Sequence, residues 1–167
     1  KIVKILAGKP VIQRTYEKCL QAAVGDVIIA TEAQIVADTC ARFGAKAILT
    51  SAACQSGTDR IYEAAQGRTE QFIINVQGDE PFIDPATIVK IVHLLKSDPA
   101  CDIATAVIAT TDDKIIDNPN CVKAVLTADK RALYFSRSRV PYKPRIASIA
   151  AFTATAARRW KNLSTCR

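Results

Sequence analysis

The 167-residue sequence predicts an α/β fold of three layers, in which helices cover both faces of a mixed, largely parallel sheet. Apolar strand-like runs alternate with segments of helical periodicity from residue 10 to residue 98, an order typical of parallel sheets. Beyond residue 100 the strand-like runs follow one another with few helices, which favours antiparallel strands at that end of the sheet. The length fits a single domain over residues 1–167.

In the first half of the chain, each predicted strand is followed by a predicted helix. Pro10 stands at the start of the first helix, where its missing N–H is tolerated, and apolar residues then recur at helical spacing. The second helix ends near Gly44, a residue suited to a C-terminal cap. Short β-branched runs between the helices indicate buried strands. The helices are expected at 10–23, 33–44, 56–67 and 85–98, and the strands at 26–31, 45–51 and 71–76.

The second half contains three further strand-like runs and a short polar crossing at 112–120. The strands are expected at 102–108, 121–127 and 131–138. No internal repeat or low-complexity linker separates the two halves. The sequence therefore favours one continuous sheet.

The formal charge of the chain is +7, from 23 basic and 16 acidic residues. A basic surface suits nucleic acid, or a small polyanion such as a nucleoside triphosphate. Apart from a cluster at 130–145, the basic residues are scattered, and they lack the interleaved aromatic residues that single-strand binders use. We therefore expect no nucleic-acid partner.

The cysteines and the single histidine argue against a zinc site. None of the six cysteines forms a Cys-x-x-Cys pair, and His93 lies within an apolar helical pattern. Free thiols used as small core residues are typical of a reducing compartment. No apolar run reaches the roughly 20 residues that a membrane helix needs. We therefore expect a cytoplasmic location without membrane insertion.

Polar residues gather directly after three of the predicted strands. In open α/β sheets, ligands bind outside the carboxyl ends of the strands, because loops and helix amino termini converge there. The three clusters together therefore predict a polar crevice. They lie at 31–34, 51–60 and 77–81.

The stretch SGTDR (56–60) suits nucleotide recognition. Gly57 lets the backbone approach a ring closely, Ser56 offers a hydroxyl beside the amides of a starting helix, and Arg60 offers a planar fork of donors. The alternative is a plain helix cap, with Ser56 or Thr58 as the N-cap and Asp59 in the first turn. The local pattern alone favours the cap.

The stretch VQGDEP (76–81) ends an apolar run with two adjacent carboxylates. Asp79 suits a hard divalent cation, since Mg²⁺ binds carboxylate oxygen together with water and substrate phosphate. The amide of Gln77 suits the edge of a base, and Gly78 permits the turn. The alternative is a solvated acidic turn, which the local pattern alone favours, and the role of Glu80 stays open.

These motifs resemble those of one enzyme family. NVQGDEP, with SGTDR before it, is similar to the 3-deoxy-manno-octulosonate cytidylyltransferases, also called CMP-KDO synthetases. AGKPVIQRTYEKCLQA, VIIAT, NPNCVKAVL and ALYFSRSRVPY follow in the family's order, so the resemblance covers most of residues 5–142. The motifs are less similar to those of the sialic acid cytidylyltransferases. The resemblance implies a Rossmann-like nucleotidyltransferase fold.

The resemblance implies that CTP and KDO react to give CMP-KDO and pyrophosphate, with Mg²⁺, in a homodimer that serves lipopolysaccharide biosynthesis. The anomeric hydroxyl of the sugar attacks the α-phosphorus, so catalysis rests on positioning and on neutralising phosphate charge. Two alternatives stay open. One is a cytidylyltransferase for another acidic sugar of the sialic acid type, and the other is a nucleotide-binding relative without catalysis.

The resemblance also implies roles for single residues. Asp79 binds the magnesium ion and is one of two catalytic residues; the other, Arg137, faces the carboxylate of the sugar acid, which its bidentate fork suits. Lys123 is a further substrate-binding candidate, and the alternative for it is a solvated strand residue. The nucleotide-binding residues implied are Gln77, Ser56, Gly57, Arg60 and Lys1.

The sequence also differs from the family's pattern. The family's triphosphate loop, of the type PARxxSTRLPGKP, is absent here: Lys1, eight positions before Lys9, stands for its lysine, but Ile2 stands where a proline would follow. Ala33 replaces a usual acidic residue. Ile146 and Ala150 stand where a histidine and a tyrosine are expected near the sugar. A second metal-binding aspartate is expected beyond Arg167. We therefore expect this sequence to lack the N-terminal triphosphate loop and the C-terminal part.

Overall fold

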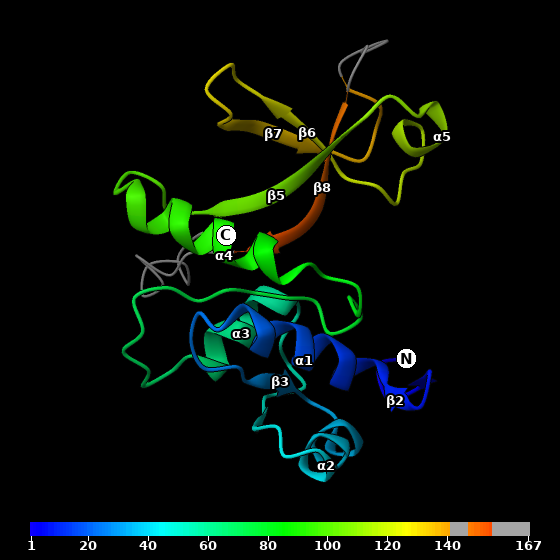
Figure 1. The fold of residues 1–167 in the computed structure, drawn as a ribbon, viewed down its shortest axis with the longest axis vertical. Coiled ribbons are helices and arrows are strands. Elements are labelled where there is room, and N and C mark those ends of the chain that lie inside the picture. Colours follow the sequence, from blue (N-terminus) through cyan, green and yellow to red (C-terminus); the bar gives the residue numbers. More distant parts are fainter. Residues whose placement is uncertain (141–146, 155–167) are drawn as a thin grey trace. The chain divides into compact units, whose positions relative to one another are not determined.

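The computed structural model describes residues 1–140 and 147–154, and the chain forms two compact units (Figure 1). The first unit is built from Lys1–Ala104 and the second from Thr105–Thr153. Ile146 lies outside the described residues, as do the side chains of 147–154, so the comparison of Ile146 and Ala150 with the family stays a prediction. No helix in the described ranges is long and apolar enough to cross a membrane.

The first unit contains short strands and all of the longer helices of the described chain. Its strands are β1 (Ile5–Leu6), β2 (Lys9–Pro10), β3 (Ile29–Thr31) and β4 (Ala47–Leu49). Its helices are α1 (Val11–Ala22), α2 (Gln34–Arg42), α3 (Gly57–Ala64) and α4 (Pro85–Ser97). The four helices predicted from periodicity are thus confirmed, with small differences at their ends.

The ends of these helices follow from local chemistry. Pro10 is the N-cap of α1, one position before the place that the sequence suggested. Gly44 has a positive φ of 76° just beyond α2, and the next amide, that of Ala45, returns to the carbonyl of Cys40 over 3.0 Å. At α4, the Asp84 carboxylate accepts a 3.0 Å hydrogen bond from the amide of Ala86. These caps use backbone groups that a helix end leaves without intrahelical partners.

β3 and β4 form the parallel pair of the first unit. Ile29 pairs with Ala47 and Thr31 with Leu49, and the strand ends Thr31 and Leu49 lie at one edge. A buried apolar cluster joins α1, β3 and α2 and consists of Ile12, Ile29, Val36, Cys40 and Ala45. α1 also contacts α4.

The strand predicted at 71–76 is wrong in this structure, where residues 71–76 have no assigned strand. A strand requires a ladder of hydrogen bonds with a neighbour. In the described part of the chain, β3 and β4 form their sheet with each other alone. The loop at 77–81 is therefore positioned by other contacts, described below.

The second unit is a four-stranded sheet in the order β5-β8-β6-β7. β6 (Lys123–Leu126) pairs antiparallel with β7 (Ala132–Ser136) and with β8 (Ala147–Ala154), which confirms the antiparallel strands expected in the second half. β5 is Ala104–Thr110. The predicted polar crossing contains the short helix α5 (Asp113–Ile116). The described chain is thus an α/β fold with both parallel and antiparallel strand pairs.

Candidate functional site

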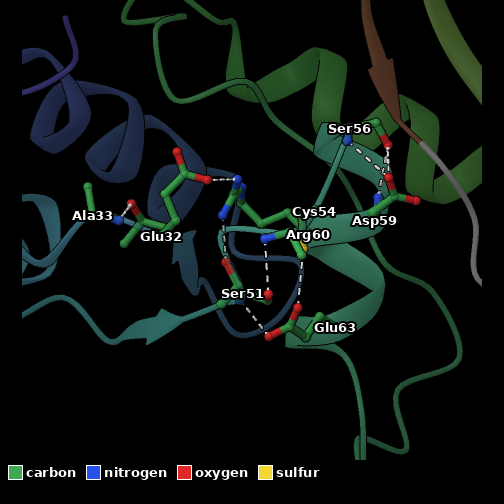
Figure 2. Close-up of polar contacts among 11 residues, drawn as sticks. Glu32, Ala33, Ser51, Cys54, Ser56, Asp59, Arg60 and Glu63 are labelled. Atoms are coloured by element: carbon green, nitrogen blue, oxygen red, sulfur yellow. Dashed lines mark hydrogen bonds and ion pairs between the residues drawn. The ribbon is translucent and has the colours of Figure 1, made fainter.

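Arg60 joins the ends of β3 and β4 to the first turns of α3 (Figure 2). Its Nη1 donates to the hydroxyl of Thr50 over 2.7 Å, directly after β4. Its Nη2 forms an ion pair with Glu32, directly after β3. Sequence reasoning named Arg60 but missed Glu32 and Thr50 as its partners. The available signal was their position, because each residue directly follows a strand of the parallel pair.

Ser56 is the N-cap of α3 and forms a capping box with Asp59 (Figure 2). The hydroxyl of Ser56 accepts from the amide of Asp59 over 3.1 Å, and the Asp59 carboxylate accepts from the amide of Ser56 over 2.9 Å. The plain-cap alternative is therefore confirmed for Ser56. The nucleotide-binding role of Ser56 stays a prediction, and the cap fixes the helix start on which that role depends.

The segment before α3 is held by Glu63, which lies about two helical turns beyond the N-cap Ser56 (Figure 2). Its carboxylate accepts from the amide of Ser51 over 2.7 Å and from the thiol of Cys54 over 3.2 Å. The hydrogen bond to Glu63 raises the pKa of the Cys54 thiol. An open hollow of about 560 Å³ lies here and is lined by Ser51, Ala53, Cys54, Gln55, Asp59, Tyr62, Glu63 and Gln66. Neither Gln77 nor Asp79 lines it, so the hollow is separate from the loop at 77–81.

Gln77 and Gly57, two predicted nucleotide-binding residues, lie next to each other. A Cβ placed on Gly57 would meet the Nε2 of Gln77 at 3.9 Å, which is ordinary van der Waals contact. The structure thus brings the amide of Gln77 to the first turn of α3, where backbone amides are directed outward. This arrangement suits a planar base that lies over Gly57 and forms hydrogen bonds along its edge with the amide of Gln77.

The close approach of α1 to the loop explains why position 78 is a glycine. A Cβ on Gly78 would lie 2.9 Å from the Cδ1 of Ile12, and its φ is not in the positive region. The buried hydroxyl of Thr15 donates to the Gly78 carbonyl over 3.1 Å. The sequence assigned Gly78 to the turn itself; the need for glycine comes instead from packing against Ile12. Sequence reasoning had no signal for Thr15, which lies 63 positions away.

Asp79 forms an ion pair with Lys1, over 2.7 Å between Nζ and Oδ2. The structure thus brings together two residues predicted for the metal and the nucleotide. The hydrogen bond from Lys1 lowers the pKa of Asp79, and the same bond raises the pKa of Lys1. The Asp79 carboxylate is therefore ionised at neutral pH. Its side chain is 37% exposed.

A magnesium ion at this loop would need carboxylate oxygens as ligands. In the described ranges, no three His, Cys, Asp or Glu side chains gather into a metal-binding group. Mg²⁺ commonly uses one or two protein carboxylates and completes its shell with water and substrate phosphates. Asp79 is ionised and partly exposed, so it is suited to be the single protein carboxylate of such a site.

Arg137 and Lys123 belong to the second unit. Arg137 is exposed just after β7, and its Nη1 donates to the carbonyl of Pro119 over 3.1 Å. Lys123 is fully buried, so the alternative of a solvated strand residue is wrong. Its ammonium donates to the carbonyls of Asn118, Cys121 and Arg137 over 2.9, 2.8 and 2.6 Å.

The chain is similar to curated and solved cytidylyltransferases. A family model described as cytidylyltransferase matches residues 1–159. The 3-deoxy-manno-octulosonate cytidylyltransferase of Elusimicrobium minutum is 53% identical over 143 residues, which is 86% of this chain and 58% of that relative. The enzyme of the same name from Rhodopirellula baltica is 48% identical over 144 residues, 85% of this chain and 58% of that relative. The chain thus spans somewhat more than half the length of these relatives.

Two solved structures share the fold. A CMP:2-keto-3-deoxy-manno-octonic acid synthetase complexed with CTP superimposes with a TM-score of 0.90 at 36% identity, covering 98% of this chain and 70% of that one. A 4-diphosphocytidyl-2C-methyl-D-erythritol synthase from Anaerococcus prevotii has a TM-score of 0.55 at 11% identity, covering 91% of this chain and 62% of that one, and shows the fold alone. The family match and the first of these structures show that the chain belongs to the cytidylyltransferase family, among the 3-deoxy-manno-octulosonate cytidylyltransferases.

Proposed function

We propose that the protein transfers CMP from CTP to the anomeric hydroxyl of KDO. The observation that carries the proposal is the 0.90 TM-score to a CMP:2-keto-3-deoxy-manno-octonic acid synthetase complexed with CTP. The 53% and 48% identities to curated 3-deoxy-manno-octulosonate cytidylyltransferases support it. The sugar oxygen forms a bond to the α-phosphorus, pyrophosphate leaves, and the hydroxyl proton passes to solvent or a base.

In this proposal the first unit binds the nucleotide. Gln77 recognises the edge of the cytosine, and Gly57 at the start of α3 lets the base approach the backbone. The capping box at Ser56 fixes that helix start. Arg60 is held by Glu32 and Thr50 at the strand ends, in a place suited to a nucleotide oxygen. Lys1 donates to phosphate oxygens.

Asp79 is the proposed protein ligand of Mg²⁺. Such an ion, when bound, neutralises phosphate charge during the transfer. Lys1 beside Asp79 adds a second positive charge at the same place, and the ionised state of Asp79 suits a hard cation. Arg137 of the second unit is the proposed partner of the sugar carboxylate, since its planar fork donates two parallel hydrogen bonds.

The architecture that we propose is a single, three-layer, Rossmann-like domain with a mixed, largely parallel sheet. The parallel pair of β3 and β4, with α1 and α2 packed around it, supports this arrangement. The likeness to the solved synthetase over 98% of the chain supports it further. A cytoplasmic location, where CTP is made, and a role in lipopolysaccharide biosynthesis belong to the same proposal.

A homodimer is also part of the proposal. Among the strands that the structure describes, β7 is an edge strand of its sheet, and it exposes three consecutive large apolar side chains, Leu133, Tyr134 and Phe135. Apolar edge strands are normally covered, because they invite pairing with another chain. We expect that replacing Leu133 and Phe135 together by lysine converts a dimer into a monomer in sedimentation equilibrium. A monomeric parent protein would contradict the dimer.

The function is tested by turnover with purified full-length protein, CTP and Mg²⁺. Pyrophosphate release is measured with KDO and, separately, with a sialic acid at equal concentrations. Release with KDO alone is expected. Faster release with the sialic acid would favour the alternative sugar, and CTP binding without release from either sugar would favour a non-catalytic relative.

Gln77→Ala is expected to raise the KM for CTP by about 10-fold, as expected for the loss of one or two hydrogen bonds to a base edge. The KM for KDO should change much less, because the proposal assigns the sugar carboxylate to Arg137 and the base edge to Gln77. Steady-state kinetics with each substrate varied in turn measure both values. Gln71→Ala, at an exposed position just before the same segment, is the control. Equal effects on both KM values would make Gln77 a structural residue.

A further inference from the structure

Lys123 is a buried lysine at the start of a central strand. In β6 it pairs with Ser136 of β7 on one side and with Ile149 of β8 on the other. Its side chain is fully buried, and its ammonium makes three hydrogen bonds to backbone carbonyls. An ammonium has three N–H donors, so none is left for a ligand.

A buried ammonium is costly unless its donors are satisfied. Here the three acceptors come from two separate segments. Asn118 and Cys121 lie in the loop before β6, and Arg137 lies just beyond the end of β7. Lys123 therefore links the loop at 118–121 to the backbone of Arg137.

Arg137 is tied to the same loop a second time, through its side chain. Its Nη1 donates to the carbonyl of Pro119, between the two loop carbonyls that Lys123 binds. The loop thus holds one nitrogen of the guanidinium, while Lys123 holds both the loop and the Arg137 carbonyl. Any displacement of Lys123 changes the loop and the main chain from which the guanidinium projects.

We propose that Lys123 is a positioning residue that sets the orientation of Arg137 toward the carboxylate of the acidic sugar. This inference rests on the function proposed above. It replaces the direct substrate contact that the sequence suggested for Lys123, because the ammonium is occupied by carbonyls. A guanidinium binds a carboxylate bidentately only in a defined orientation, so a loosened loop weakens the binding of the sugar acid.

The test uses the full-length protein and a graded series at one position. Lys123→Met keeps the approximate length of the side chain and removes all three donors, while Lys123→Gln keeps two N–H donors. Lys123→Met is expected to raise the KM for KDO by about 10-fold and Lys123→Gln by less, with the KM for CTP changed less than about 2-fold. Lys114→Met, at an exposed position of α5 in the same unit, is the control and should match the parent. Thermal unfolding shows which variants are folded at the assay temperature.

The decisive measurement is a double-mutant cycle with Arg137→Ala. If Lys123 acts through Arg137, Lys123→Met should add little to the KM for KDO once Arg137 is alanine. Additive increases, or equal increases in both KM values, would show a general structural role and overturn the proposal. If Lys123→Met is unfolded, the cycle is run with Lys123→Gln and judged in the same way. A parent protein that does not use KDO would refute the proposed function instead, before any variant is compared.

Discussion

Asp79→Asn is expected to lower the rate of CMP-KDO formation by at least about 100-fold at saturating Mg²⁺, while the fold is retained. Asparagine has nearly the shape of aspartate but no charge, so it no longer offers the anionic oxygen that a hard cation prefers. The ion pair with Lys1 is lost as well. Lys1 is largely exposed and Asp79 is partly exposed, and such surface pairs contribute little to stability.

The rate is measured as pyrophosphate release across a Mg²⁺ titration, and the fold by circular dichroism and thermal unfolding. Glu80→Gln is the matched control, because it removes the neighbouring carboxylate from the same turn. Near-parent turnover of Asp79→Asn would refute the metal assignment. A loss in Glu80→Gln as large as that in Asp79→Asn would show that the total charge of the loop matters more than the position of Asp79.

Gly78→Ala is expected to destabilise the fold and to reduce activity. Its Cβ would lie 2.9 Å from the Cδ1 of Ile12. Such overpacking costs about 1–3 kcal/mol, and the lower end applies because Cδ1 is the tip of a side chain that can shift. The residue precedes Asp79, and a displacement of about 1 Å at a reacting group costs up to about 100-fold in rate.

Ile12→Val tests the mechanism of this effect, since valine lacks Cδ1. Combined with Gly78→Ala it should restore part of the lost stability and activity, although Ile12→Val alone costs about 0.5–1.5 kcal/mol. Denaturant unfolding and pyrophosphate release are measured for the single and double variants. Gly25→Ala is the control, because nothing lies within 4 Å of its added Cβ and its φ is not positive. Additive losses in the double variant would contradict the steric explanation.

Helices were the part of the fold that the sequence predicted best. Their apolar periodicity is local, and their ends carry recognisable residues such as Pro10 and Gly44. The strand expected at 71–76 shows the opposite case, because a strand depends on a partner that the run itself does not specify. Apolar composition alone therefore did not predict pairing, and residues 72–76 are only partly buried.

The candidate site was predictable in its residue types and less so in its contacts. Motif order identified Gln77, Gly57 and Asp79, and the structure places the first two together and the third beside Lys1. The partners that hold them lie far away in the sequence. Thr15 reaches Gly78 across 63 positions, and Lys1 reaches Asp79 across 78, through contacts that no local pattern encodes.

The ion pair between Lys1 and Asp79 affects how a metal cation can bind to Asp79. A cation that takes Oδ2 of Asp79 competes with the ammonium of Lys1 for the same oxygen. Because the ammonium is largely exposed, releasing it costs little, and the carboxylate stays ionised until the exchange. In the proposed magnesium site, Lys1 is therefore a counter-ion that the divalent cation displaces, and its positive charge is then free to pair with a phosphate of the proposed nucleotide.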